Sequence, residues 1–433
     1  MDKRIANSAV AGATALVSNG RVNSNHLGDS MPIHSATPIH TGLGRVADTA
    51  RHDNVVQSKV DEWLRSFGLT HDPFRVLNAG EDTRLREYLV AHDAFEAIRA
   101  DETTLLFAPA GGGKSAFRVR LADACRAGEN GRRLFPIAYL IPDSILVAPT
   151  QDEWPAHERA ICQAAALELW LRFSFRPQEF LDLDQHQRWT VRFMLDRALP
   201  GPLDYFLDAL VSGGDPAEAA RVYDPTARWP NVPTAEQYSE FYRALKAVVG
   251  PGNYNVNPHS LNAWARLLVE DLNFEGVFLL LDGIDAYPET LKNAQTAVQL
   301  LNPLLSRAAQ WTQLSVFFKA FLPVELLPLM RQEELTTDVR IVTIVWSQEL
   351  LVSFIRRRVE AAMKTAPASL DMLSDPGLRN LDASLVSAAK PLPRDVMMLV
   401  ERLFFEHVRR AGASGKLSEE DLEAALAGYQ NEQ

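Results

Sequence analysis

The chain has 433 residues, of which 47% are hydrophobic and 23% charged, and its formal net charge at pH 7 is -11. This composition is that of a soluble globular protein, and the length predicts roughly two to three domains. No apolar run approaches the roughly 18 residues that a membrane span requires. The net negative charge argues against a protein that holds nucleic acid mainly by electrostatic attraction, because such proteins carry a surplus of Lys and Arg.

Residues 1–57 are rich in Ser, Asn, His, Gly and Thr and show no sustained hydrophobic period, which predicts a disordered N-terminal tail. Lys3 and Arg4 precede an Ala-rich run that faintly resembles a signal peptide. Because that run is short and diluted by Gly and Thr, we expect a cytoplasmic protein. Cys125 and Cys162 lack metal-ligand spacing, so we expect reduced thiols in the core.

Ordered structure is expected from about Lys59, with an apolar cluster at residues 63–69 and two short helices within residues 85–98. A glycine turn then joins a strand to a helix. Residues 105–108 predict a buried strand, residues 111–113 are all glycine, and a Lys-Ser pair opens a segment of helical period. Strand, glycine turn, Lys-Ser pair and helix together are the architecture of a phosphate-binding loop.

We therefore expect this loop to bind a nucleotide, because glycines let backbone N–H groups surround an oxyanion and the helix adds its dipole. Lys114 would reach the β- and γ-phosphates, and Ser115 would place its hydroxyl on Mg²⁺. The motif resembles the Walker A pattern, with Ala108 at the first glycine position. The alternative is a glycine-rich turn that binds nothing. The expected nucleotide-binding residues are Pro109, Ala110, Gly111, Gly112, Gly113, Lys114, Ser115 and Ala116.

A long helical segment separates this loop from the next motif. Residues 134–141 predict a second strand, and residues 153–249 predict helices punctuated by prolines. Lys114 and Asp282 lie 168 positions apart (282 minus 114), more than a compact module of this kind needs. We therefore expect an all-helical insertion at residues 151–255.

The second motif is an apolar run that ends in an acid. Residues 276–281 predict a strand buried on both faces, as in the centre of a parallel sheet. Asp282 follows at the carboxyl end, where α/β sheets bind ligands. Asp282 is therefore expected to hold Mg²⁺, directly or through water, together with Ser115.

The sequence Asp282-Gly283-Ile284-Asp285 resembles the Walker B form of STAND-type ATPases within the AAA+ group. This resemblance implies that the nucleotide is ATP. Gly283 stands where AAA+ enzymes usually place Glu to polarise the attacking water, and the resemblance passes part of that role to Asp285. Ala286 stands where relatives often carry another acid. We therefore expect slow hydrolysis, as in a switch rather than a motor.

Two further strands are predicted, at residues 314–322 and 339–345. Lys319 interrupts the first near its carboxyl end, where the resemblance implies a polar sensor of the nucleotide. The alternative is a lysine whose head reaches solvent. Arg331 and Arg340 are two candidates for an arginine finger that acts on a neighbouring subunit's γ-phosphate.

Residues 346–433 predict helices, the first with Ser347 as its N-cap and the last, residues 417–429, with Ser418 as its N-cap. Arg356, Arg357 and Arg358 are expected on a solvated face, and the alternative is that they approach the nucleotide or a partner. A Pro-Arg turn before the long helix at 396–404 resembles the start of the helix that bears the second sensor in the AAA+ lid. The resemblance implies that Arg394 senses the γ-phosphate and moves the lid.

These observations predict an α/β fold, an AAA+-like P-loop NTPase with a parallel sheet, a helical insertion and a C-terminal helical lid. The expected parts are a tail at 1–57, an ATPase core at 58–150 and 256–345, the insertion at 151–255 and the lid at 346–433. The expected cofactors are ATP and Mg²⁺, and the expected catalytic residues are Lys114, Asp282, Asp285 and Arg394.

The function expected is that of a nucleotide-dependent switch that forms a homo-oligomer or engages a partner protein in trans, without a membrane. Two alternatives remain open. Residues 67–74 resemble a segment of secretion and transposition ATPases, which favours a DNA-associated loader or regulator, although the acidic balance opposes it. The second alternative is a scaffold that binds ATP for stability and does not hydrolyse it.

Overall fold

The computed structural model describes residues 46–142, 145–146, 154–199, 235–250, 256–291, 293–332, 339–365 and 367–432. The chain divides into two compact units, Met1–His52 and Asp53–Gln433. The sheet and the pocket lie in the second unit. The predicted tail lies outside the described residues up to position 45, and its boundary at 57 is too late because helix α1 (Val46–Ser66) begins before it.

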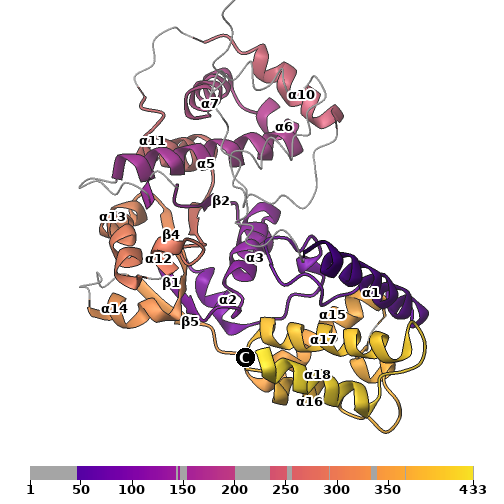
Figure 1. The fold of residues 1–433 in the computed structure, drawn as a ribbon. Helices are drawn as coiled ribbons and strands as arrows, with labels where there is room; N and C mark the ends of the chain where they lie inside the picture. The colour runs from indigo at the N-terminus through magenta and orange to yellow at the C-terminus, as the bar shows by residue number, and fades with distance from the viewer. Residues whose placement is uncertain are drawn as a thin grey trace, which may run out of the picture. The chain divides into compact units, whose positions relative to one another are not determined.

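A five-stranded sheet, parallel throughout, forms the centre of the second unit, with strand order β2-β3-β4-β1-β5 (Figure 1). Strands β1, β2 and β3 are buried at every residue, as continuous apolar runs predict for a parallel sheet. The predicted α/β class is confirmed. The strands are β1 (Thr103–Ala108), β2 (Leu134–Tyr139), β3 (Gly276–Leu281), β4 (Val316–Pro323) and β5 (Val339–Thr343).

Helices cover both faces of this sheet, because successive residues of each strand point to opposite faces. Leu105 and Phe107 of β1 pack with helices on one face, and Leu106 and Ala108 pack with helices on the other. The first face is covered by α5 (Trp154–Phe175), α11 (Leu261–Arg266), α13 (Ala294–Thr312) and α14 (Leu327–Gln332). The second is covered by α2 (Asp93–Ile98) and α3 (Lys114–Ala127).

The described part of the predicted insertion is helical, but its first helix belongs to the central core. Residues Ile161, Cys162 and Leu169 of α5 share one buried cluster with Phe135 and Ile137 of β2. Residues 200–234 of the insertion lie outside the described residues. The other helices here are α6 (Pro177–Leu181), α7 (Gln185–Ala198) and α10 (Ala235–Lys246), and η3 (Leu267–Asp271) and α12 (Pro288–Leu291) flank β3.

The C-terminal helices form a second core, which also contains Val60, Trp63, Leu64, Leu69 and Phe74 from before the sheet (Figure 1). Trp63 of α1 lies fully buried against Phe404, with ring centroids 5.3 Å apart, and its indole N–H donates to the carbonyl of Gly415. The apolar cluster expected in the ATPase core therefore belongs with the predicted lid. This C-terminal helical cluster comprises α15 (Gln348–Met363), α16 (Leu381–Ala388), α17 (Pro393–Ala411) and α18 (Glu419–Glu432).

Short 3-10 turns complete the described elements: η1 (Leu85–Glu87), η2 (Glu129–Gly131), η4 (Val324–Leu326) and η5 (Leu370–Leu373). Both predicted N-caps are confirmed, since Ser347 accepts from the N–H of Leu350 and Ser418 from that of Asp421. Both cysteines are buried free thiols, as expected.

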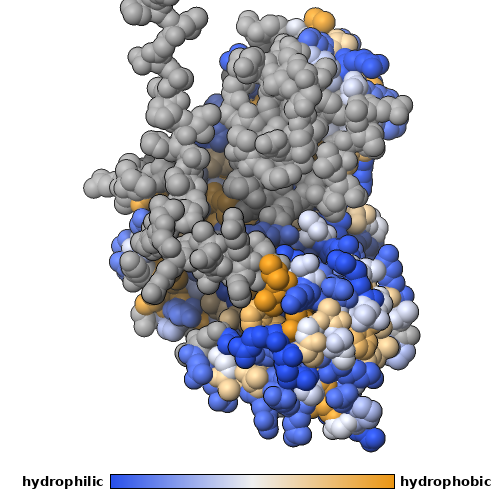
Figure 2. Space-filling view, turned by 45° about the vertical axis from the view of Figure 1, so that its right-hand side comes forward, coloured by the Kyte–Doolittle hydropathy of each residue, from blue (hydrophilic) through white to orange (hydrophobic). Residues whose placement is uncertain are grey.

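The surface carries no membrane-spanning candidate: no helix in the described ranges combines the length and the apolar composition needed to cross a bilayer. On the face that Figure 2 presents, the coloured residues are mostly hydrophilic, and the hydrophobic ones gather in small patches.

Candidate functional site

A pocket of about 970 Å³ lies beside the carboxyl end of β1. The chain leaves β1 through α3 on one face of the sheet and leaves β4 through α14 on the other. Open α/β sheets bind ligands where the connections of neighbouring strands diverge in this way. The pocket is bordered by the glycine loop (residues 109–113), by the segment at 76–93 and by the C-terminal helical cluster. The sheet topology alone therefore favours this pocket as the functional site.

The glycine loop has the backbone geometry that an anion requires. Gly111 (φ +79°) and Gly113 (φ +96°) adopt left-handed conformations, which let successive N–H groups point inward. No protein acceptor within the described ranges takes the N–H groups of Gly113, Lys114, Ser115 and Ala116. These N–H groups begin α3, which has no side-chain cap, so the helix dipole adds to their positive potential. The loop can bind an oxyanion.

Lys114 is buried against the pocket and held loosely. Only 7% of the residue is exposed. Its ammonium lies 3.0 Å from a carboxylate oxygen of Asp285, and its contacts with the carbonyls of Ala108 and Pro109 are long, at 3.3 and 3.4 Å. Both Lys114 and Asp285 line the pocket, as does the half-buried Ser115. An anion in the pocket could therefore take Lys114 from Asp285.

Asp282 is placed differently from the expectation. It does not line the pocket. One of its oxygens accepts from Nε of Arg118 at 3.1 Å, and the other accepts from the N–H of Gly283 at 2.8 Å. The Arg118 and Asp282 side chains are 5% and 8% exposed. The structure thus brings Lys114, Ser115 and Asp285 together at the pocket, and Asp282 lies behind them with both oxygens engaged, so it does not fit a direct Mg²⁺ ligand.

Arg394 reaches the pocket from the start of α17 and contacts the glycine loop there. Its backbone N–H donates to the carbonyl of Gly111 at 3.3 Å, and a Cβ on Gly111 would lie 2.8 Å from the Cβ of Arg394. Only glycine fits this contact. The Arg394 side chain is exposed and has no carboxylate partner among the described residues, which leaves its guanidinium available to an anion.

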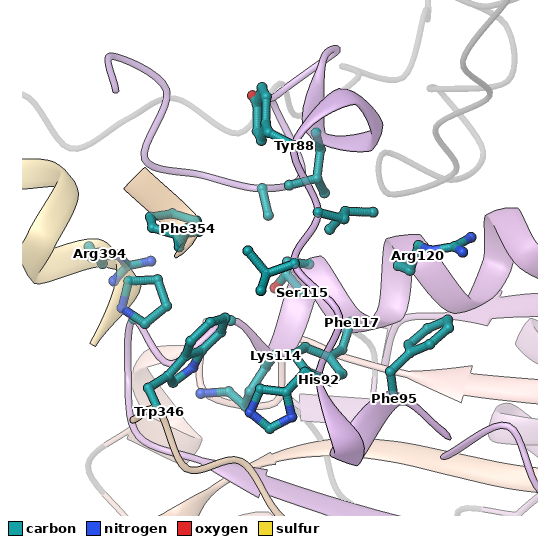
Figure 3. A pocket seen from close by; sticks show the side chains of 18 of the residues that line it. Tyr88, His92, Phe95, Lys114, Ser115, Phe117, Arg120, Trp346, Phe354 and Arg394 are labelled. Carbon is teal, nitrogen blue, oxygen red and sulfur yellow. The ribbon is translucent and has the colours of Figure 1, made fainter. Parts of the chain in front are cut away.

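Figure 3 shows Arg394 and Phe354 approaching from the side of the C-terminal helices, with Phe95 and Arg120 opposite and Lys114 and Ser115 between them. Part of the lining away from the loop is apolar, beside charged residues such as Arg86, Glu96 and Arg358. The apolar part includes Val76, Leu77, Leu89, Val90, Phe354 and Met397. A ligand with a charged end and a planar apolar end matches this division of the pocket.

Trp346 is a site residue that the sequence did not reveal. Its indole N–H donates to the carbonyl of Gly112 at 3.0 Å, and its ring lies 5.2 Å from that of His92. His92 accepts from the N–H of Ala94 through Nδ1, so its Nε2 carries the proton and donates to the carbonyl of Val345. These contacts fix the loop against the chain that leads into α15. Trp346 offered no signal beyond its place before a helix.

The sequence also led to a wrong expectation for Arg358 and did not single out Arg118. Arg358 was expected on a solvated face, but it is 3% exposed because it pairs with Asp82 at 3.4 Å and lies over the Tyr88 ring at 4.1 Å. Arg356 and Arg357 are exposed, as expected. Arg118 follows Lys114 by four positions, which places both on one face of a helix, and this spacing could have predicted that both meet the acidic motif.

The remaining sensor candidates lie elsewhere. Lys319 was expected near the carboxyl end of its strand, and that expectation is wrong: it pairs in register with Thr104, near the start of β1. Its ammonium donates to the carbonyls of Ala100 and Glu102, each at 2.6 Å, so its head does not reach solvent either. Arg340 pairs with Glu102 at 2.6 Å. The side chain of Arg331 lies outside the described residues.

Comparisons with known proteins identify no relative: no protein-family model, curated protein or solved structure matches this chain significantly. The site's assignment therefore depends on its own geometry.

Proposed function

We propose that the chain is a P-loop ATPase of the AAA+/STAND type that acts as a nucleotide-dependent switch. The observation that carries this proposal is the set of unpaired loop N–H groups at Gly113–Ala116, next to Lys114 and the exposed Arg394, in one pocket. Backbone N–H groups, a lysine and an arginine around one cavity are the donors that bind a polyphosphate. The apolar part of the lining would accept the base, and the resemblance of both motifs to AAA+ proteins favours ATP.

The contacts of the loop carbonyls support a coupling between nucleotide and lid. In a loop whose N–H groups point inward, the carbonyls point outward, and here those of Gly111 and Gly112 accept from Arg394 and Trp346. Phosphate binding that reorients either peptide would therefore strain or strengthen a contact with the C-terminal helical cluster. This cluster would be the bistable element that the γ-phosphate biases through Arg394.

The pairing of Lys114 with Asp285 supports slow hydrolysis. Phosphate oxygens would draw the ammonium away from Asp285, which would leave that carboxylate free to accept a hydrogen bond from the attacking water. A single acid in this role, beside Gly283 and Ala286, fits a switch that stays in the ATP state for long periods. The output would be a homo-oligomer or an interaction with a partner protein.

The test is the mass of the purified protein in solution with and without ATP and Mg²⁺, measured beside phosphate release. We expect assembly with slow release in the wild type, loss of assembly in Lys114→Ala, and assembly with less release in Asp285→Ala. Lys416→Ala, which removes an exposed lysine outside the pocket, should behave as the wild type. An unchanged mass without phosphate release would contradict the switch.

A further inference from the structure

Arg118 and Asp282 form a buried ion pair directly behind the pocket. The guanidinium Nε lies 3.1 Å from one carboxylate oxygen, and the N–H of Gly283 lies 2.8 Å from the other. Their side chains are 5% and 8% exposed. This carboxylate is both neutralised in charge and hydrogen-bonded at each oxygen, so it lacks the unsatisfied negative charge that draws a cation into a protein site.

The Arg118–Asp282 pair lies close to the glycine loop, because Arg118 belongs to the helix that follows the loop. Lys114 and Arg118 are one helical turn apart on α3, and each pairs with one of the two acids that follow β3, Asp285 and Asp282. The two pairs differ in access. The Lys114–Asp285 pair lines the pocket, whereas the Arg118–Asp282 pair does not.

A magnesium ion at Asp282 would have to displace Arg118 or share the carboxylate with its guanidinium, whose positive charge would repel the ion. Removing one partner from a buried ion pair is strongly unfavourable, because the remaining charge stays buried and unpaired. Mg²⁺ also gives up its water molecules reluctantly. The presence of Arg118 therefore opposes metal coordination by Asp282. The exchange of Lys114 from Asp285 to a phosphate costs less, because the ammonium gains a new anionic partner and the Asp285 side chain is 25% exposed.

We infer that Arg118 takes the place of a metal ion beside Asp282, and that the pocket binds nucleotide phosphates without a Mg²⁺ ion held by that carboxylate. This inference rests on the proposed nucleotide site. Lys114, Arg394 and the loop N–H groups supply the positive potential for the phosphates. Arg118 is a positioning residue, which holds Asp282 and the end of β3 in place and does not touch the ligand.

The experiment measures the affinity of the full chain for a fluorescent ATP analogue by anisotropy, in excess EDTA and in excess Mg²⁺. We expect dissociation constants that agree within about threefold. Binding that requires Mg²⁺ would overturn the inference and leave the nucleotide site standing. Binding in neither condition would overturn the proposed function and the inference with it. This comparison needs only the wild-type protein.

Two variants then assign the effect to Arg118. Arg118→Lys keeps a cation and should bind the analogue equally in both conditions, whereas Arg118→Gln leaves Asp282 unpaired and should bind at least about fivefold more tightly with Mg²⁺. Mg²⁺ alone should raise the melting temperature of Arg118→Gln and leave that of the wild type unchanged. Arg126→Gln, which opens another buried arginine–carboxylate pair, with Glu168 outside the pocket, is the matched control. An Arg118→Gln protein with the wild-type response to Mg²⁺ in both measurements would overturn the role of Arg118.

Discussion

Two buried lysines, Lys114 and Lys319, lie toward opposite ends of the same sheet and are held in different ways. The ammonium of Lys319 donates at 2.6, 2.6 and 3.1 Å to the carbonyls of Ala100 and Glu102 and to the hydroxyl of Thr104, which uses all three of its N–H groups. The ammonium of Lys114 has one carboxylate at 3.0 Å and two carbonyls beyond 3.2 Å. Lys114 borders the pocket and Lys319 does not.

The two lysines differ as a lysine available to a ligand differs from one that stabilises the fold. Lys319 is 1% exposed, and its nitrogen lies 4.8 Å from the centre of the Phe278 ring. Its partners are two backbone carbonyls and the hydroxyl of the buried Thr104, so no ligand can replace them. Lys114 faces a carboxylate that is itself partly exposed, and a phosphate offers stronger acceptors than the carbonyls it would leave.

The largest effect is expected for Lys114→Ala, which should weaken ATP binding more than about 100-fold, because the charge that meets the β- and γ-phosphates is lost. Isothermal titration with ATP measures this. Lys319→Met should leave the affinity within about twofold of the wild type, since its ammonium meets only protein groups. Equal losses of ATP affinity in the two variants would contradict the proposed difference between the lysines.

A smaller effect is expected for Arg394→Ala. The affinity for ATP should fall about tenfold and the affinity for ADP should stay nearly unchanged, because the guanidinium is assigned to the γ-phosphate. Competition against a fluorescent nucleotide measures both. Arg409→Ala, which removes an exposed arginine of the same helix that pairs with Glu406, is the control. Equal losses for ATP and ADP would show that Arg394 does not distinguish the two nucleotides.

Lys319 should also make the free energy of unfolding depend on pH. Burial lowers the pKa of Lys319 from 10.5 to about 7. Between those values the unfolded chain binds a proton that the folded chain does not, so stability rises with pH, by about 1 kcal/mol from pH 7 to pH 8. Urea unfolding at the two pH values should show this rise in the wild type and a smaller one in Lys319→Met. The same rise in both proteins would contradict the assignment to Lys319.

The smallest effect is expected for Trp346→Phe, which removes the hydrogen bond to the Gly112 carbonyl and keeps most of the aromatic packing. Stability should fall by about 1 kcal/mol, the net contribution of one hydrogen bond, and ATP affinity should fall by a few-fold at most. Thermal unfolding and titration measure the two. Stability and affinity equal to those of the wild type would remove Trp346 from the coupling between loop and lid.

The sequence predicted those parts of the fold that depend on local pattern. Strand β3 follows the apolar run at 276–281, and Ser347 and Ser418 cap their helices, because apolar runs and capping side chains act over a few positions. The contact between Trp63 and the C-terminal helices could not be predicted in this way. It joins residues 352 positions apart, and no local period indicates which surfaces will pack together.

The site was predictable to the same extent. The loop residues and Asp285 meet at the pocket, because glycine turns and strand ends carry local signals. The partners of Lys319 and Arg358 were not predictable, since each pairs with groups brought close by the sheet or by the C-terminal helical cluster. The role of a charged residue therefore depends on which groups the tertiary fold places beside it.

Hydrogen exchange with and without ATP can show which end of the sheet meets the nucleotide, because one measurement covers the backbone near Lys114 and the backbone near Lys319. We expect slower exchange in peptides covering residues 109–118 and 393–399, where the loop meets Arg394, and no change in peptides covering residues 98–104, where Lys319 is held. Unchanged exchange at 109–118, or protection confined to residues 98–104, would contradict the assignment of the nucleotide to this pocket.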